Sequence, residues 1–281
     1  MASQKQKKRG KLFIIGGGED KDGRTKILER VAREVGSGKL VVSTVGTGEP
    51  EETWKEYREV FKKLGVKRIE HLNVRNREEA LAEKTAKILD GATVVFFTGG
   101  DQLKITSQLG DSIAYRKINE LFEEGGTVAG TSAGASVMSE TMLVGGNGDQ
   151  SHQIDQMIQM APGFGLIKGV VIDQHFAERG RLGRLLGAVA QNPAHLGVGI
   201  DENTAVILYG QDEFEVLGEG AVYVLDGRHT SYSNLTEDEQ KAKTLSVFDV
   251  KLHVLSEGNR FDLQDRRPSV PPKPEEEAEV A

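Results

Sequence analysis

The chain has 281 residues, a formal net charge of −7 and no cysteine. The missing cysteines exclude disulfides, thiolate metal sites and a cysteine nucleophile, and the negative charge argues against a general nucleic-acid-binding protein. No apolar run approaches the roughly 20 residues that a membrane-spanning helix needs, and the polar, basic start is unlike a signal peptide. We therefore expect a cytoplasmic protein that binds neither nucleic acid nor membranes.

Apolar and amphipathic segments alternate along the first half of the chain. Strands are expected at 11–15, 40–45, 66–72, 92–97 and 125–129, and helices at 22–35, 51–64, 78–89 and 112–124. This βαβα alternation predicts a parallel sheet with helices on both faces. Because such sheets bind ligands beyond the carboxyl ends of their strands, the glycine-rich turns at 16–18, 46–48 and 98–102 should converge on one edge.

The second half changes character after a strand at 169–172 and a helix at 181–190. Short strands are then expected at 197–201, 204–209, 214–217 and 222–225, with a final hairpin of 245–255 and 260–263 across the turn Glu257-Gly258-Asn259. Residues 145–163 read as an irregular loop. The composition predicts a disordered basic arm over 1–10, a single α/β domain over 11–264 and a disordered Pro- and Glu-rich tail over 265–281.

The segment Gly130-Thr131-Ser132-Ala133-Gly134 lies between a predicted strand and the first turn of a helix. In that context G-x-S-x-G predicts a nucleophile elbow, whose serine is strained and whose glycines avoid clashes with the strand and the helix. The pattern makes Ser132 the candidate nucleophile, and the alternative is a turn that only binds a ligand. An oxyanion hole needs two N–H donors, for which Ala133 and the Gly99-Gly100 turn are candidates.

A serine nucleophile needs a base within hydrogen-bond reach and an acid that orients the base. Among the six histidines, His175 fits best because an apolar strand carries it to the carboxyl edge of the sheet, and His152 is the competitor. Asp201 and Glu202 end an apolar run and are the candidate acids, which spacing does not separate. An ordinary acidic turn is the alternative. The order Ser, His, acid differs from the Ser, acid, His order of α/β-hydrolases.

Three arginines, Arg179, Arg181 and Arg184, follow His175 closely. Guanidinium groups bind carboxylates through two parallel hydrogen bonds, so the cluster predicts a substrate that bears carboxylates. The alternative is a solvated basic start of a helix.

Taken together these motifs resemble the cyanophycinase family over about residues 10–265. The resemblance rests on Gly16-Gly17-Gly18-Glu19, Phe97-Thr98-Gly99-Gly100-Asp101-Gln102, Gly130-Thr131-Ser132-Ala133-Gly134-Ala135, Asp173-Gln174-His175-Phe176 with the three arginines, and Gly199-Ile200-Asp201-Glu202-Asn203-Thr204-Ala205. It implies a serine peptidase domain similar to class I glutamine amidotransferases. That fold is a flavodoxin-like parallel sheet with helices on both faces, to which this chain adds C-terminal β-strands.

The resemblance also implies a substrate and a set of site residues. The family cleaves cyanophycin, multi-L-arginyl-poly-L-aspartate, at the aspartate backbone by exo-acting hydrolysis, and releases β-Asp-Arg dipeptides. Ser132 would be the nucleophile, His175 the base, Glu202 its partner, and Gly100 and Ala133 the oxyanion hole. The implied substrate pocket comprises Gln102, Asp173, Gln174, Arg179, Arg181 and Arg184. The family uses no cofactor or metal and is usually dimeric, so a homodimer is expected.

The charges of the polymer agree with this pocket, since each repeat carries a guanidinium and a carboxylate. The arginines can take the carboxylates, and Asp173 is the candidate partner of the guanidinium. Two other functions stay open. One is a serine dipeptidase for aspartyl dipeptides, which would not need three arginines. The other is a non-catalytic anion- or nucleotide-binding module built on the turns 16–18 and 46–48, neither of which matches a dinucleotide-binding or P-loop pattern.

Overall fold

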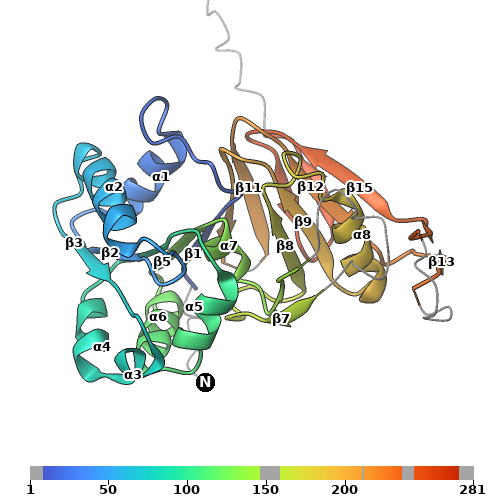
Figure 1. The fold of residues 1–281 in the computed structure, drawn as a ribbon. Helices are drawn as coiled ribbons and strands as arrows, with labels where there is room; N and C mark the ends of the chain where they lie inside the picture. The colour runs from blue at the N-terminus through green and yellow to red at the C-terminus, as the bar shows by residue number, and fades with distance from the viewer. Residues whose placement is uncertain (1–8, 146–158, 211, 236–243, 272–281) are drawn as a thin grey trace, which may run out of the picture.

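The computed structural model describes residues 9–145, 159–210, 212–235 and 244–271 (Figure 1). Its larger sheet contains a parallel half in the order β1-β5-β4-β2-β3. The strands of this half are β1 (Lys11–Ile15), β2 (Leu40–Ser43), β3 (Ile69–Leu72), β4 (Val94–Phe97) and β5 (Thr127–Thr131). The α/β fold with a parallel sheet, predicted from the alternation of apolar and amphipathic segments, is therefore confirmed.

Helices cover both faces of the parallel half. They are α1 (Lys26–Val35), α2 (Pro50–Lys63), α3 (Arg77–Leu81), α4 (Glu83–Leu89), α5 (Gln102–Leu109), α6 (Ile113–Glu123) and α7 (Ala133–Ser136). The remaining described helix, α8 (Leu182–Gln191), lies on the second sheet. Successive side chains of a strand point to opposite faces. Accordingly Phe13 packs in the cluster that contains α1 and α2, whereas Leu12 packs in the cluster that contains α4, α5 and α6. Burial on both faces explains why these strands are continuous apolar runs in the sequence.

Antiparallel strands extend the sheet beyond β1 to nine strands, in the order β10, β11, β16, β17. Their bounds are β10 (Thr204–Tyr209), β11 (Glu213–Gly218), β16 (Arg260–Asp262) and β17 (Arg267–Ser269). β10, β11 and β16 are among the C-terminal strands that the sequence predicts, whereas β17 was not predicted.

A second sheet has four strands in the order β15-β12-β9-β8, of which β8 and β9 are parallel. Its strands are β8 (Val170–Gln174), β9 (Leu196–Ile200), β12 (Val222–Asp226) and β15 (Lys251–Leu255). One face packs on the nine-stranded sheet, and α8 covers the other face (Figure 1). The sequence did not predict this second sheet, because the pattern of β8 is that of any buried parallel strand.

Two short ladders complete the described secondary structure. They consist of β6 (Thr141–Leu143) with β7 (Met160–Pro162), and of β13 (Tyr232–Ser233) with β14 (Val247–Phe248). No described helix is long and apolar enough to cross a membrane.

The predicted final hairpin is wrong. β15 pairs with β12 in the smaller sheet, and β16 pairs with β11 in the larger one, so the turn at Glu257-Gly258-Asn259 carries the chain from one sheet to the other. A tight turn between two alternating segments favours a hairpin, but packing against two existing sheets decides the partners here.

The ends of the predicted domain also differ. Gly10, in the expected arm, donates its N–H to Phe122 O at 2.8 Å, and β17 lies inside the expected tail. For residues 1–8 and 272–281, outside the described residues, the disorder stays a prediction.

Asp226 forms ion pairs with two arginines, one of which, Arg266, directly precedes β17. Its carboxylate is fully buried and accepts hydrogen bonds from Arg266 at 2.6 Å and from Arg228 at 2.9 Å. Burial by itself raises the pKa of Asp226, but the hydrogen bonds from the two arginines outweigh it and lower that pKa from 3.8 to about 2. The carboxylate therefore stabilises the folded state above about pH 4, and this contribution is lost as the pH falls through about 2.

We expect Asp226→Asn to lower the free energy of unfolding by about 1–3 kcal/mol near neutral pH, because Arg266 and Arg228 lose their charged, buried acceptor. The difference from the wild type should shrink as the pH falls from about 4 to about 2. Urea titrations across this range measure it, with the exposed Asp265→Asn as the control. A difference that stays constant with pH would contradict the assignment.

Candidate active site

Ser132 lies at the turn from β5 into α7 with φ 55° and ψ −113°. This backbone conformation is strained for a residue with a side chain and costs about 1–3 kcal/mol. The flanking glycines are required for space, since a Cβ on Gly130 would lie 2.3 Å from Gly134 O, and one on Gly134 would lie 2.4 Å from Phe97 O. The strained turn predicted from the glycine pattern is therefore present.

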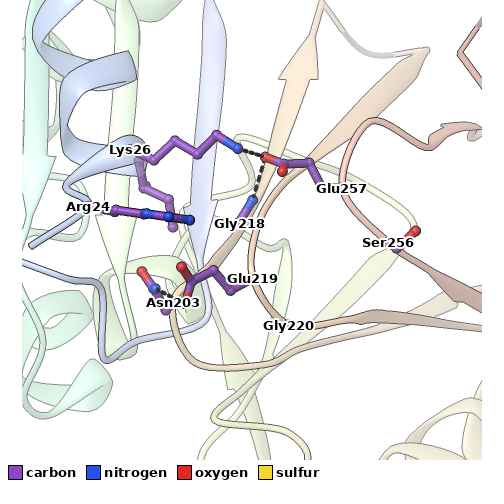
Figure 2. Close-up of a pocket in the computed structure, with 9 residues that line it drawn as sticks. Arg24, Lys26, Asn203, Gly218, Glu219, Gly220, Ser256 and Glu257 are labelled. Carbon is purple, nitrogen blue, oxygen red and sulfur yellow. Dashed lines mark hydrogen bonds and ion pairs between the residues drawn. The ribbon is translucent and has the colours of Figure 1, made fainter.

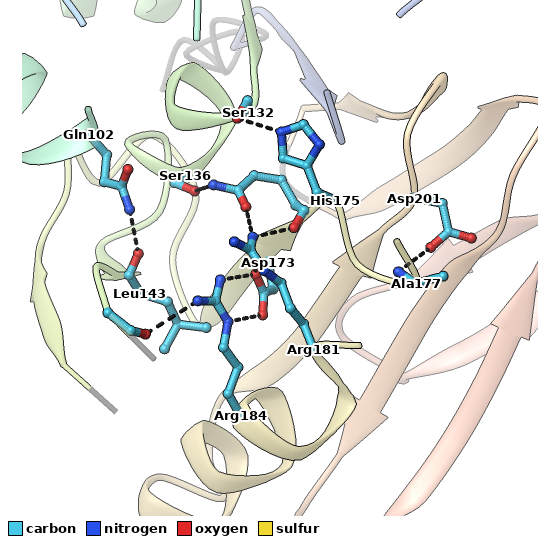
Figure 3. A network of polar contacts seen from close by, with 12 residues as sticks. Gln102, Ser132, Ser136, Leu143, Asp173, His175, Ala177, Arg181, Arg184 and Asp201 are labelled. Carbon is cyan, nitrogen blue, oxygen red and sulfur yellow. Dashed lines mark hydrogen bonds and ion pairs between the residues drawn. The ribbon is translucent and has the colours of Figure 1, made fainter. Parts of the chain in front are cut away.

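His175 directly follows β8, and its imidazole bridges two polar side chains. Nε2 lies 2.8 Å from Oγ of Ser132 (Figure 3). Nδ1 lies 2.5 Å from Oε1 of Glu202. The carboxylate of Glu202 favours the proton on Nδ1, which leaves Nε2 free to accept the serine proton. Ser132, His175 and Glu202 thus form a hydrogen-bonded chain with the geometry of a catalytic triad.

Asp201, the other candidate acid, has a different role. Its two oxygens accept the N–H groups of Ala177 and Ala221, each at 3.0 Å, and the side chain is buried. It therefore fixes the backbone just after His175, while Glu202 reaches the imidazole. His152, the competing base, lies outside the described residues.

The glycine turn after β1 supports the histidine and the glutamate. A Cβ on Gly17 would lie 2.3 Å from Cε1 of His175, and one on Gly18 would lie 2.7 Å from Oε2 of Glu202. The turn also accepts the N–H of His175 on Gly16 O at 2.8 Å. Sequence reasoning linked this turn to anion binding as an alternative and did not find its contact with the histidine, which only the fold creates.

The two candidate oxyanion donors lie on the turns that flank Ser132. Ala133 begins α7, and Gly100 has φ 129° and packs against Gly46 so closely that a Cβ on it would lie 2.2 Å from Gly46 O. In the described part of the chain, neither backbone N–H has a hydrogen-bond acceptor.

The arginine cluster is divided by burial. Arg181 and Arg184 are 9% and 5% exposed, whereas Arg179 is exposed. Arg184 donates two hydrogen bonds to Asp173, from Nε to Oδ2 at 2.7 Å and from Nη2 to Oδ1 (Figure 3). Arg181 also donates to Oδ1 of Asp173, at 3.2 Å. Burial, opposed by the charge of Asp173, lowers the pKa of Arg181 to about 10. The alternative interpretation, in which the arginines are a solvated basic segment, therefore fits only Arg179.

This placement changes the expected role of Asp173. The carboxylate is completely buried, and both of its oxygens accept hydrogen bonds from the chain's own arginines. Because Asp173 is already paired within the protein, it is not a free acceptor for a substrate guanidinium. Gln174 donates to Ser136 Oγ at 3.2 Å and accepts from Arg181, which links this network to the helix that follows Ser132. Gln102 donates to Leu143 O at 3.0 Å.

Sequence reasoning missed a buried carboxylate beside the serine. Glu19 is 5% exposed and accepts hydrogen bonds from Thr131 Oγ1 at 2.5 Å and from the Tyr57 hydroxyl. Burial and the charge of Glu19 raise the pKa of Tyr57 well above its ordinary value. Glu19 stands in the first glycine motif, which was the one available signal, whereas Tyr57 lies on a helix without any motif.

A separate pocket of about 350 Å³ lies behind the turn at Asn203 and is shown in Figure 2. Its Lys26 pairs with Glu257 at 2.5 Å, and Asn203 donates to Glu219 at 3.1 Å. Neither Ser132 nor His175 lines this pocket, so the candidate site is the cleft beside the serine.

An α/β fold with a serine–histidine–glutamate chain at its sheet edge is typical of serine hydrolases. Residues 12–216 match Peptidase family S51. The protein is a serine-type peptidase, and it belongs to Peptidase family S51.

Similar proteins support this classification. The chain is 36% identical to the cyanophycinase of Trichormus variabilis over 259 residues, which cover 91% of this chain and 86% of that protein. It is 34% identical to the cyanophycinase of Geminocystis herdmanii over 271 residues, which cover 94% and 97% of the two chains. The crystal structure of a peptidase from an acI-B1 Actinobacterium is similar with a TM-score of 0.64 and 25% identity, over 86% of this chain and 98% of that one. The resemblance found in the sequence is confirmed.

We expect Gly17→Ala to disturb His175, since the new methyl group would overlap the imidazole. Reactivity of Ser132 toward a fluorophosphonate should fall by ~100-fold, the usual effect of misplacing a reacting group by about 1 Å. The second-order labelling rate measures this without any substrate. Gly65→Ala is the matched control, because Gly65 also has a positive φ of 86° but no atom within 4 Å of its Cβ position. Equal labelling rates for the two variants would contradict the contact.

Arg184→Lys should lower the free energy of unfolding by about 1–3 kcal/mol, because an ammonium cannot make the two-pronged contact that Asp173 receives in the interior. Arg179→Lys keeps the same charge at an exposed position and should change stability by less than about 0.5 kcal/mol. Urea denaturation followed by circular dichroism compares the two variants. Indistinguishable midpoints would mean that the buried pairing contributes nothing.

Proposed function

We propose that this protein is an exo-acting serine peptidase that hydrolyses the aspartate backbone of cyanophycin and releases β-Asp-Arg dipeptides. The observation that carries the proposal is the chain Ser132–His175–Glu202, with distances of 2.8 Å and 2.5 Å, set on a strained serine. The substrate class rests on the similarity to cyanophycinases over 91% of the chain.

The proposed reaction proceeds through an acyl-enzyme. Ser132 Oγ attacks the aspartyl carbonyl while His175 Nε2 takes the serine proton, and Glu202 stabilises the imidazolium through Nδ1–H. The imidazolium then returns the proton to the leaving amine. A water molecule, deprotonated by His175, hydrolyses the ester and releases the serine.

The N–H groups of Gly100 and Ala133 are proposed to stabilise the oxyanion of both tetrahedral intermediates. Each such donor contributes about 3 kcal/mol to the transition state. Their unengaged state within the described residues supports this role.

The arginine cluster is proposed to bind the α-carboxylates of the substrate. Arg181 and Arg184 both pair with the single carboxylate of Asp173, so this buried group carries a net positive charge. Arg179 is exposed and is the proposed contact. The buried pairs of Arg181 and Arg184 with Asp173 position Gln174, and Gln102 is the first residue of α5.

A second candidate function is a serine dipeptidase acting on aspartyl dipeptides. The same triad would serve it, and such a small substrate would not need three arginines. Incubating the protein with purified cyanophycin and with a panel of Asp-X dipeptides, with products identified by mass spectrometry, separates the two functions. β-Asp-Arg from the polymer supports the proposal, and turnover of the dipeptides alone overturns it.

The non-catalytic anion- or nucleotide-binding function is less favoured, because the turn at Gly16–Gly18 is filled by the side chains of His175 and Glu202. We further propose a cytoplasmic homodimer, as the resemblance to cyanophycinases implies. Sedimentation velocity at micromolar concentration tests the dimer.

Ser132→Ala should lower kcat on cyanophycin by several orders of magnitude with the fold unchanged, and His175→Ala should approach the same defect. The double variant should be little worse than either single variant, because the members of a triad act as a unit. Steady-state kinetics on the polymer and circular dichroism measure the two properties. Multiplicative defects in the double variant would show that Ser132 and His175 act independently and would reject the triad.

A further inference from the structure

A cleft of about 300 Å³ opens beside Ser132 and His175, on a side that none of the proposed substrate residues reaches. Its walls come from the turn after β1, from α2 and from the loops around the serine. Besides the serine and the histidine, its lining includes Glu19, Lys21, Thr53, Glu56, Tyr57 and Thr131. Gln102, Gln174 and the arginine cluster do not line it, so the cleft is a second approach to the same nucleophile.

Two opposite charges meet in this cleft. Lys21 Nζ lies 3.3 Å from Oε1 of Glu56 and 4.7 Å from the centre of the Tyr57 ring. The side chains of Lys21 and Glu56 are 27% and 51% exposed. An exposed ion pair of this kind contributes little to stability and separates readily when a charged ligand offers better partners.

The two glutamates of the cleft differ in what they can bind. Glu19 is buried, and its oxygens already accept from Thr131 and Tyr57. Glu56 is on the same face of α2 as Tyr57 and Thr53, with its carboxylate toward solvent. Glu56 is therefore the carboxylate that a guanidinium can reach, while Glu19 and Tyr57 anchor the wall to the residue before Ser132.

We infer that Lys21 and Glu56 form a second substrate subsite for the cyanophycin repeat on the opposite side of the scissile bond from the repeat held by the arginine cluster. The inference rests on the proposed function. Glu56 accepts two hydrogen bonds from the guanidinium of that repeat, and Lys21 donates to its α-carboxylate. A repeat with one positive and one negative group matches a pair of opposite charges held side by side.

The test compares Glu56→Gln and Lys21→Met with a matched ion pair on the same helix. Glu59 and Lys62 lie 3.6 Å apart, are 60% and 45% exposed and do not line the cleft, so Glu59→Gln and Lys62→Met are the controls. KM and kcat are measured on cyanophycin, and Ser132 reactivity is measured with a fluorophosphonate. We expect each cleft variant to raise KM by about tenfold, the effect of one lost charged contact, with kcat and labelling unchanged. The controls should stay within about twofold of the wild type.

The other possible outcomes distinguish a failure of the proposed function from a failure of the subsite. A wild-type protein that does not cleave cyanophycin overturns the proposed function and the subsite with it. A wild type that cleaves the polymer, with cleft variants that match the controls, overturns the subsite alone. Cleft variants that slow labelling as much as cleavage also overturn the subsite, since Lys21 and Glu56 would then act by holding the serine turn.

Discussion

The approach of one glycine turn to one imidazole is the constraint on which the rest of the site depends. Ser132 comes from the nine-stranded sheet, whereas His175 follows a strand of the smaller sheet. The two sheets meet where Gly17 leaves room for the histidine ring, and where Gly16 O accepts the N–H of His175 at 2.8 Å. The hydrogen-bonded chain from serine to glutamate therefore spans an interface between layers, and its distances are set by how the sheets pack.

The buried charges next to this interface favour a single arrangement. Asp173, Arg181 and Arg184 are removed from water, so separating them would leave an uncompensated charge in the interior, which is far more costly than breaking an exposed pair. Because Arg181 also contacts Gln174, and Gln174 contacts Ser136, the network reaches the helix behind the serine. The network thus connects the buried arginines to the helix that follows Ser132.

Much of the first half of the fold was predictable, because parallel strands buried on both faces leave uninterrupted apolar runs and glycine turns mark their ends. The geometry of Ser132 was predictable for the same reason. The strands with which β15 and β16 pair were not predictable. Alternating apolar and polar residues indicate which face of a strand is buried, but not which strands lie beside it. The burial of Arg181 and Arg184 could not be predicted either. A sequence shows that an arginine is charged, but it does not show that both arginines pair with the buried Asp173. Asp201 and Glu202 were adjacent candidates that only the direction of their side chains distinguishes.

Three of the six described non-glycine residues with positive φ are Ser132, His175 and Asn203, the residue after Glu202. The backbone strain of this protein is thus concentrated where its polar chemistry is assembled. Glycine at position 132 would adopt the same turn without that strain. Ser132 therefore holds strain that a glycine would release, so this position presents a direct conflict between folding and the proposed chemistry, and any selection for thermal stability alone would tend to erase the hydroxyl.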